Sequence, residues 1–189
     1  MAKPIVITIS GRSGHGKSTF AEYLEEELEG RMAWLNVRRD RFAKGVKEKA
    51  LEVGWDGKKD QNGRALLQFI GTEWGRQCIN QDIWVKDAAE RISKDDQVII
   101  FDDARFYNEV EYFALAKQYT SWAVKLVRIN SDGNIWDNEL GELKDHASEL
   151  DLPDELFDKI IRHYHKGRLR LEAKNMAKDI LNYLKTEVK

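Results

Sequence analysis

Residues 5–18 of the chain read IVITISGRSGHGKS, and this stretch decides the fold. The run Ile5–Ile9 is short, apolar and rich in β-branched residues, and it stops at a serine and a glycine, which is typical of a buried parallel strand. The next eight residues match G-x-x-x-x-G-K-(S/T) in full. Apolar residues at 20, 24 and 28 then recur at helical spacing, and Gly30 ends that pattern. Strand, glycine-rich loop and helix in this order predict a phosphate-binding loop (P-loop).

The residue types of this loop suit an anion. Glycines let the backbone wrap closely around a phosphate and present successive N–H groups to its oxygens. The lysine reaches the β- and γ-phosphates, the following hydroxyl can ligate Mg²⁺, and the helix N-terminus adds positive charge. The alternative, a turn that merely joins strand to helix, is disfavoured by the flanking strand and helix. We therefore predict an ATP-type site formed by Gly11, Arg12, Ser13, Gly14, His15, Gly16, Lys17, Ser18 and Thr19.

The rest of the chain alternates between strand and helix patterns. Further strands are expected at residues 34–37, 98–101, 122–129 and 158–164, and helices at 46–51, 66–78, 85–92, 110–114 and 169–184. Gly71 and Gly75 interrupt the third of these patterns, and Asp82 is a candidate N-cap for the helix that follows. The alternation predicts an α/β fold with a parallel five-stranded sheet flanked by helices.

Composition narrows the class of protein. The 189 residues, 42% apolar and 34% charged, fit a single globular domain over 1–189. A net charge of −2 gives no reason to expect a nucleic-acid polymer or a membrane surface as partner. Cys78 is the single cysteine, which excludes an intramolecular disulfide. No apolar run is long enough for a signal peptide or a membrane span, so a cytoplasmic protein is expected. Oligomeric state, including a homodimer, stays open.

A second polar group follows the strand expected at 98–101. It reads Asp102-Asp103-Ala104-Arg105, and ligands of open α/β sheets bind where strands end. A carboxylate there could organise Mg²⁺ or accept a substrate proton, and an arginine could bind phosphate through two hydrogen bonds. The alternative is a solvated turn, which the position after a central strand beside a P-loop disfavours.

Several blocks of the sequence resemble bacteriophage deoxynucleoside monophosphate kinases. Residues 66–76, LLQFIGTEWGR, resemble the family's L-L-Q-x-x-G-T-(D/E)-x-x-R stretch. The others are DIWVK at 82–86, DARF at 103–106 with Asn108-Glu109, and HASE at 146–149 before Leu152-Pro153. With the P-loop, these blocks follow the family's order across about residues 5–160.

The resemblance implies transfer of the ATP γ-phosphoryl group, with Mg²⁺, to a deoxynucleoside 5′-monophosphate. It also implies a P-loop kinase fold with an acceptor-binding segment at about 40–86 and a lid at about 130–157. Acceptor contacts are then expected from Lys47, Arg76, Trp84, Lys86, His146 and Glu149. For Trp84 the alternative is packing in the core, for Arg76 a solvated surface position, and for His146 a surface position on a loop.

The lid segment departs from what nucleotide kinases commonly carry. Between Asn130 and Phe157 the sequence has Lys144 but no arginine, and it is strongly acidic. Cations that neutralise the transferring phosphate must therefore come from elsewhere, with Arg105 and Arg128 as leading candidates and Arg12 as a third. We expect Lys17 to act on the phosphates, and Ser18 and Asp103 to organise Mg²⁺.

Two other functions stay open at this point. A kinase of another small phosphorylated metabolite, such as phosphomevalonate or dephospho-coenzyme A, would share the P-loop but gives no reason for the LLQFIGTE block. A nucleotide-dependent switch module would bind ATP without an acceptor. The sequence does not indicate the preferred base or the choice between deoxyribose and ribose.

Overall fold

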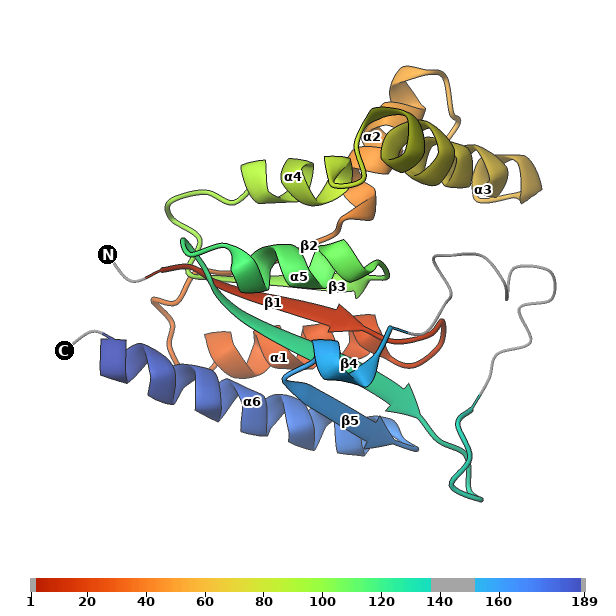
Figure 1. Cartoon of the computed structure of the whole chain (residues 1–189). Helices are drawn as coiled ribbons and strands as arrows, with labels where there is room; N and C mark the ends of the chain where they lie inside the picture. Colours follow the sequence, from red (N-terminus) through yellow and green to blue (C-terminus); the bar gives the residue numbers. More distant parts are fainter. Residues whose placement is uncertain (1–2, 137–151, 188–189) are drawn as a thin grey trace. The chain divides into compact units, whose positions relative to one another are not determined.

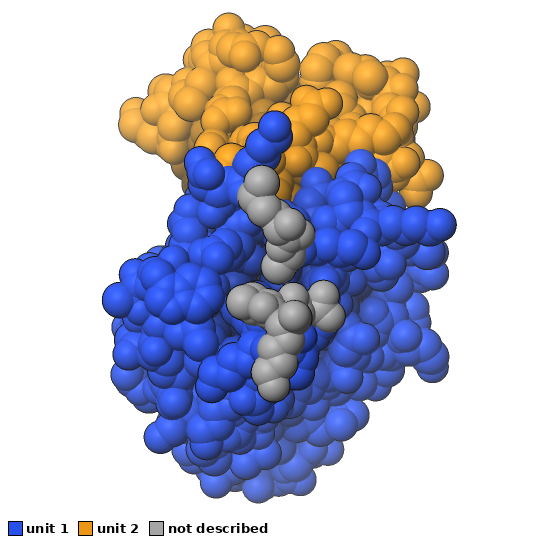
Figure 2. All heavy atoms as spheres, turned by 90° about the vertical axis from the view of Figure 1, so that its left-hand side faces the viewer, with its two compact units in different colours: residues 1–39, 94–189 blue, residues 40–93 orange. Residues whose placement is uncertain are grey.

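The computed structural model describes residues 3–136 and 152–187 (Figure 1). Its contacts divide the chain into two compact units: unit 1 comprises Met1–Arg39 and Lys94–Lys189, and unit 2 comprises Asp40–Ser93 (Figure 2). Unit 2 contains the whole segment 40–86 that was expected to bind the acceptor. The single functional domain over 1–189 stays a prediction.

The sheet has five strands in the order β2-β3-β1-β4-β5. Its central strand β1 pairs in parallel with β3 on one side and β4 on the other, and β4 pairs in parallel with β5. The predicted five-stranded parallel α/β sheet is confirmed. The strands span Ile5–Ser10 (β1), Val37–Asp40 (β2), Val98–Ala104 (β3), Thr120–Arg128 (β4) and Lys159–His163 (β5).

Helices of unit 1 cover both faces of its sheet (Figure 1). α1 (Lys17–Glu29) and α6 (Lys166–Glu187) pack together on one face, and α5 (Tyr107–Leu115) lies on the other. A short 3₁₀ turn, η4 (Asp154–Leu156), precedes β5. β1 is buried along its whole length because helices cover both faces, which is why its sequence is a continuous apolar run instead of an alternating one.

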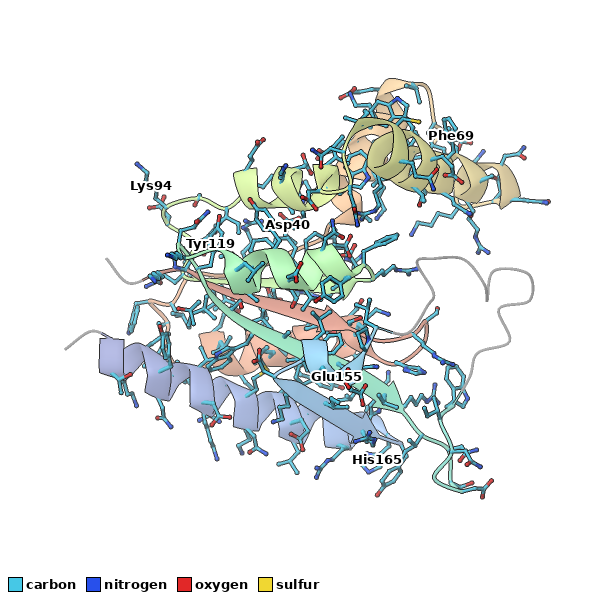
Figure 3. All side chains as sticks on the ribbon, viewed as in Figure 1. Asp40, Phe69, Lys94, Tyr119, Glu155 and His165 are labelled. Atoms are coloured by element: carbon cyan, nitrogen blue, oxygen red, sulfur yellow. The ribbon has the colours of Figure 1, made fainter. Side chains whose placement is uncertain are left out.

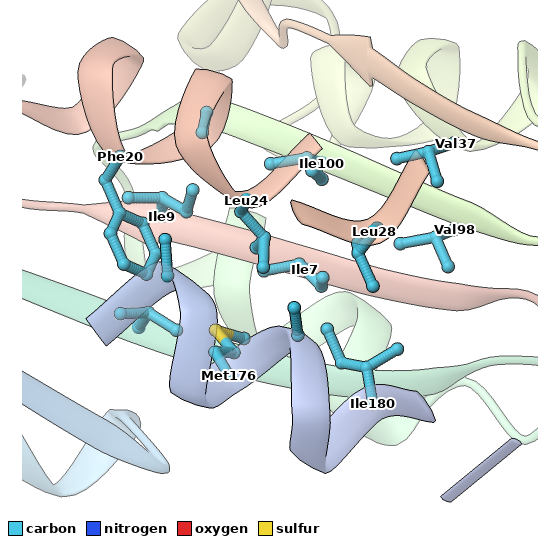
Figure 4. Packing of buried hydrophobic residues seen from close by; sticks show 14 of the residues in the cluster. Ile7, Ile9, Phe20, Leu24, Leu28, Val37, Val98, Ile100, Met176 and Ile180 are labelled. Atoms are coloured by element: carbon cyan, nitrogen blue, oxygen red, sulfur yellow. The ribbon is translucent and has the colours of Figure 1, made fainter. Parts of the chain in front are cut away.

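The main core lies between the sheet and the pair α1 and α6 (Figure 4). Phe20, Leu24 and Leu28 of α1 are fully buried there against strand residues and against Met176 and Ile180 of α6. Each fully buried side chain of this size contributes about 1.5–3 kcal/mol. This packing fixes the first turn of α1, and with it the P-loop, against the end of β1.

Unit 2 consists of helices. They are α2 (Ala43–Glu52), α3 (Gln61–Gln68), the π-helix η1 (Phe69–Ile79) and α4 (Ile83–Glu90). The sequence predicted one helix over 66–78, and the structure instead changes from α to π at residue 69. Val46, Ala50, Ile70 and Trp84 form the buried core of this unit.

Two predicted strand boundaries were wrong. β2 begins at Val37, where the predicted strand ended, because Trp34 is 62% exposed and the Gln97 side chain binds the Asn36 backbone N–H at 2.8 Å. β3 continues to Ala104, so Asp102 and Asp103 lie inside the strand. Asp82 does precede α4, but within unit 2 its side chain does not form the capping bond.

No helix of the described ranges is long and apolar enough to span a membrane.

Candidate functional site

The P-loop connects the end of β1 to the start of α1. Gly14 and Gly16 have φ angles of 78° and 84°, a conformation that other residues adopt only under strain. A Cβ on Gly14 would lie 2.7 Å from the Trp136 ring, and one on Gly16 would lie 2.7 Å from Leu169 Cδ1. Gly16 of the motif, and Gly14 at one of its variable positions, are therefore needed for these backbone angles, and both lie close to neighbouring side chains.

Lys17 lies in the first turn of α1 and folds back over the loop. Its Nζ donates hydrogen bonds to the carbonyl oxygens of Gly11, at 2.5 Å, and Arg12, at 3.1 Å. Ser18 follows it and is exposed at the helix N-terminus. An ammonium group, an exposed hydroxyl and a helix N-terminus thus converge on one loop, which is the arrangement that phosphate oxygens require.

Two buried histidines, His15 in the loop and His163 in β5, hold the P-loop in place. At the end of β5, His163 Nε2 donates a hydrogen bond to the His15 carbonyl oxygen at 2.9 Å. The His15 ring lies within hydrogen-bonding distance of two further carbonyl oxygens, those of Leu126 (3.2 Å) and Trp136 (2.9 Å). A neutral imidazole donates to one of these oxygens, and an imidazolium donates to both. The loop is therefore joined to β4 and β5 through side chains that the motif leaves variable.

The buried position of His163 gives the fold a pH dependence. Burial lowers the pKa of His163 below its ordinary value of 6.5, and its Nδ1 is shielded from water with no hydrogen-bond donor among the described residues. A base with a lowered pKa binds fewer protons in the folded state than in the unfolded state. Its contribution to stability is therefore complete above pH 6.5 and is lost as the pH falls below that value.

His163→Gln tests this effect, since the glutamine amide can still donate to the His15 carbonyl but does not titrate. At pH 8 the variant should be less stable than the wild type by about 1 kcal/mol, because the amide packs less well. The gap should narrow as the pH falls below 6.5, since only the wild type loses stability through this residue. Urea unfolding at pH 5 to 8 measures the free energy of unfolding of the wild type and the variant. A difference between them that stays the same at every pH would show that His163 contributes nothing to the pH dependence.

The end of β3 lies beside the end of β1. The pairing of the two strands shifts register between Thr8 and Ser10, so that β3 carries an extra residue at its acidic end. Asp102 is buried, at 3% exposure, whereas Asp103 is half-buried. The two carboxylates are therefore inequivalent, and Asp103 has more access to solvent.

Glu109 shapes the turn that follows β3. This buried residue of α5 accepts hydrogen bonds from the backbone N–H groups of Arg105, at 2.7 Å, and Phe106, at 3.1 Å. It thereby fixes the backbone at the position from which the half-buried Arg105 side chain extends. Glu109, which follows the DARF residues in the sequence blocks, thus has a structural role in this turn.

Arg128 lies at the end of β4, on the other side of β1. Its guanidinium is 4.1 Å from the centre of the Trp136 ring, and its carbonyl accepts from the Trp136 backbone N–H at 2.8 Å. Trp136 in turn contacts Gly14, so Arg128 and the P-loop are neighbours. β3, β1 and β4 are adjacent parallel strands. Asp103 and Arg105 lie at the end of β3, the P-loop follows the end of β1, and Arg128 ends β4.

The described parts of the predicted lid are attached to β4 at both ends. Trp136 is held as above, and the buried Lys125 donates to the Leu152 carbonyl at 2.6 Å and to Asp154 at 2.7 Å. The bond from Lys125 lowers the pKa of Asp154. The acidic centre of this segment, with the predicted contacts His146 and Glu149, lies outside the described residues.

The expected acceptor residues lie on three helices of unit 2. Lys47 (α2) and Arg76 (η1) are half-buried, and Arg76 Nη1 donates to the Gln81 carbonyl at 3.2 Å. Lys86 on α4 is exposed. Trp84 is 4% exposed and its Nε1 donates to the Gly71 carbonyl at 2.8 Å, which favours the alternative reading of this residue as part of the core. Its contact with an acceptor stays a prediction.

The residues near the P-loop suit magnesium bound mainly through nucleotide phosphates. Among residues 3–136 and 152–187, no group of three or more His, Cys, Asp or Glu side chains could hold a metal. Mg²⁺ usually keeps several waters and takes one or two protein ligands with substrate phosphates. The Ser18 hydroxyl and the Asp103 carboxylate fit that requirement.

Sequence reasoning missed His163, Trp136 and Lys125, which hold the loop and the described ends of the lid segment. None of them belongs to a local motif, since each acts on a residue distant in sequence. For His163 the available signal was a polar residue at a strand end, and that signal does not identify its partner.

Comparisons with known proteins give a partial match. No family model matches the chain. The deoxynucleoside-5′-monophosphate kinase of Escherichia phage T5 is 45% identical over 49 residues, which are 25% of this chain. The match spans 20% of that enzyme's length. Two structures of the APS kinase CysC of Mycobacterium tuberculosis, a mutant form and a complex with AMPPNP and APS, align over 98% of this chain and 99% of theirs. Their sequence identities are 12% and 13%, and their TM-scores are 0.45 and 0.48.

Proposed function

We propose that the chain is an ATP-dependent kinase that phosphorylates a deoxynucleoside 5′-monophosphate to the diphosphate. The observation that carries this proposal is the convergence of P-loop, Asp103 with Arg105, and Arg128 at the ends of three adjacent strands. Phosphoryl transfer needs positioning and charge neutralisation more than covalent chemistry, and this set supplies both. The ordered sequence blocks and the partial match to the phage T5 enzyme support the choice of acceptor.

In this proposal the loop amides and Lys17 hold the donor phosphates. Binding of nucleotide draws the Lys17 ammonium from the carbonyl oxygens of Gly11 and Arg12 to the phosphate oxygens. Ser18 and Asp103 would hold Mg²⁺, which supplies charge neutralisation at the phosphates when bound. Arg105 and Arg128 stand on either side of the loop and neutralise the transferring group, because the acidic lid segment carries no arginine for this role.

Acceptor binding is assigned to unit 2. Lys47, Arg76 and Lys86 supply positive charge for the acceptor phosphate, and Trp84 fixes the helices that carry them. His146 and Glu149 stay candidates from the resemblance alone. A kinase of another phosphorylated metabolite and a nucleotide switch are the competing functions.

The decisive experiment is an ADP-release assay across all deoxynucleoside and ribonucleoside monophosphates. The deoxynucleotides should release ADP faster than the matching ribonucleotides. Preference for AMP, or activity on a different phosphorylated metabolite alone, would overturn the choice of acceptor. Slow hydrolysis of ATP that no acceptor accelerates would favour a switch.

Asp103→Asn should lower turnover and raise the Mg²⁺ concentration needed, by roughly 10–100-fold, because an amide is a poorer partner for a hard cation and its waters. Asp102→Asn is the matched variant. It removes a charge from a buried carboxylate and should instead lower the melting temperature. Magnesium titrations and melts of both variants separate the roles. A magnesium phenotype in Asp102→Asn alone would reassign the ligand to Asp102.

A further inference from the structure

The π-helix η1 is the least regular element of the chain. It runs for eleven residues, Phe69–Ile79, whereas π-helices usually appear as single turns and are often found at functional sites. Phe69, at its start, is 53% exposed (Figure 3). Gly75 allows it to pack closely within unit 2, since a Cβ there would lie 2.7 Å from the Ile70 carbonyl oxygen and 2.8 Å from the Trp84 ring. The core of the unit therefore fixes the position of the π-helix.

Glu73 is placed by this helix with one oxygen shielded from water. The Oε2 atom is buried and accepts no hydrogen bond from any described residue. A buried acceptor without a donor costs more when it is charged, and such groups are rare in folded proteins. Glu73 as a whole is half-buried. Its shielded oxygen, held on a helix that packs against the core of the unit, can accept a hydrogen bond from a donor that is not part of the described chain.

The charge of Glu73 restricts what that donor belongs to. A carboxylate repels the phosphate of an acceptor, and Lys47, Arg76 and Lys86 already provide cations in this unit. A neutral N–H or O–H group satisfies the oxygen without repulsion. In a nucleoside monophosphate such groups occur on the base, as amino or imino groups, and on the sugar, as a hydroxyl.

We propose that Glu73 Oε2 accepts a hydrogen bond from a neutral donor on the nucleoside part of the acceptor, and that this residue determines acceptor specificity. The proposal rests on the function proposed above. A site built to hydrogen-bond a substrate group discriminates strongly against acceptors that lack it, because the buried polar atom is then left unpaired.

The test uses Glu73→Met, which keeps the length of the side chain but has no carboxylate, with Glu48→Met on the exposed face of α2 as matched control. Steady-state kinetics are measured with the four deoxynucleoside monophosphates and with a 2′,3′-dideoxynucleoside monophosphate. Glu73→Met should lower kcat/KM for the acceptor by about 10–100-fold while KM for ATP holds. Its melting temperature should equal or exceed that of the wild type, since an unsatisfied buried oxygen has been removed.

The pattern of the loss identifies the donor. A loss that differs among bases assigns it to the base. A uniform loss, together with poor use of the dideoxy analogue by the wild type, assigns it to the sugar hydroxyl. Unchanged acceptor kinetics in Glu73→Met, or a lowered melting temperature with an unchanged KM, would overturn the role of Glu73 and leave the kinase assignment standing. A wild type that phosphorylates no nucleoside monophosphate overturns the proposed function, and this inference with it.

Discussion

Lys17→Ala should lower kcat by about three orders of magnitude and leave the fold intact. Removing one fixed group that stabilises developing charge costs on the order of 10²–10³ in rate, and Lys17 would act on both the β- and γ-phosphates. The melting temperature should hold, because the side chain is half-exposed and its hydrogen bonds to Gly11 and Arg12 are made within the loop. The binding of an ATP analogue should weaken in parallel.

The control is Lys178→Ala, which removes an exposed lysine of α6 in the same unit. It should leave turnover, nucleotide binding and melting unchanged. Retained activity in Lys17→Ala would remove the P-loop from the mechanism. A strongly lowered melting temperature of Lys17→Ala would show that Lys17 is structural, and that the fold depends on its hydrogen bonds to the carbonyl oxygens of Gly11 and Arg12.

The sequence predicted the sheet well because its signals are local. The apolar run of β1, the glycines of the loop and the spacing of Phe20, Leu24 and Leu28 each depend on neighbours within a few residues. Buried parallel strands are apolar on both faces, so their pattern survives whatever packs against them. β1, β3, β4, β5 and the main helices followed from such runs.

The features that the sequence did not predict depend on distant partners. η1 reads as an α-helix in its apolar spacing, and its π geometry accompanies the packing of Gly71 and Gly75 against Val46 and Trp84. β2 was misplaced because its boundary depends on the bond between Asn36 and Gln97. At the candidate site the same division holds. The loop motif is local, whereas the support of His15 by His163 joins residues 148 positions apart.

Arg105→Lys should lower kcat and kcat/KM together, by roughly 10²-fold, with KM for the acceptor little changed. A guanidinium can form two parallel hydrogen bonds to phosphate oxygens, and an ammonium cannot reproduce that geometry. Glu109 holds the Arg105 backbone through a 2.7 Å bond, so the lysine would start from the same point and the variant tests the head group alone. The acidic lid segment, which has no arginine, makes this residue carry a role that lid arginines commonly share.

Two other outcomes have distinct meanings. If Arg105 binds the acceptor equally in the ground and transition states, KM should rise and kcat should hold, because uniform binding does not accelerate the chemical step. If Arg105 is instead a surface residue that only forms a salt bridge, neither kinetic effect is expected, and the substitution should lower the free energy of unfolding by at most about 1 kcal/mol. Arg170→Lys is the matched control, since Arg170 is a surface residue of α6 that pairs with Glu26 at 3.2 Å. Kinetics of Arg105→Lys that match those of Arg170→Lys would show that Arg105 takes no part in the reaction. Arg128, at the end of the neighbouring strand β4, would then be the candidate for neutralising the transferring phosphate.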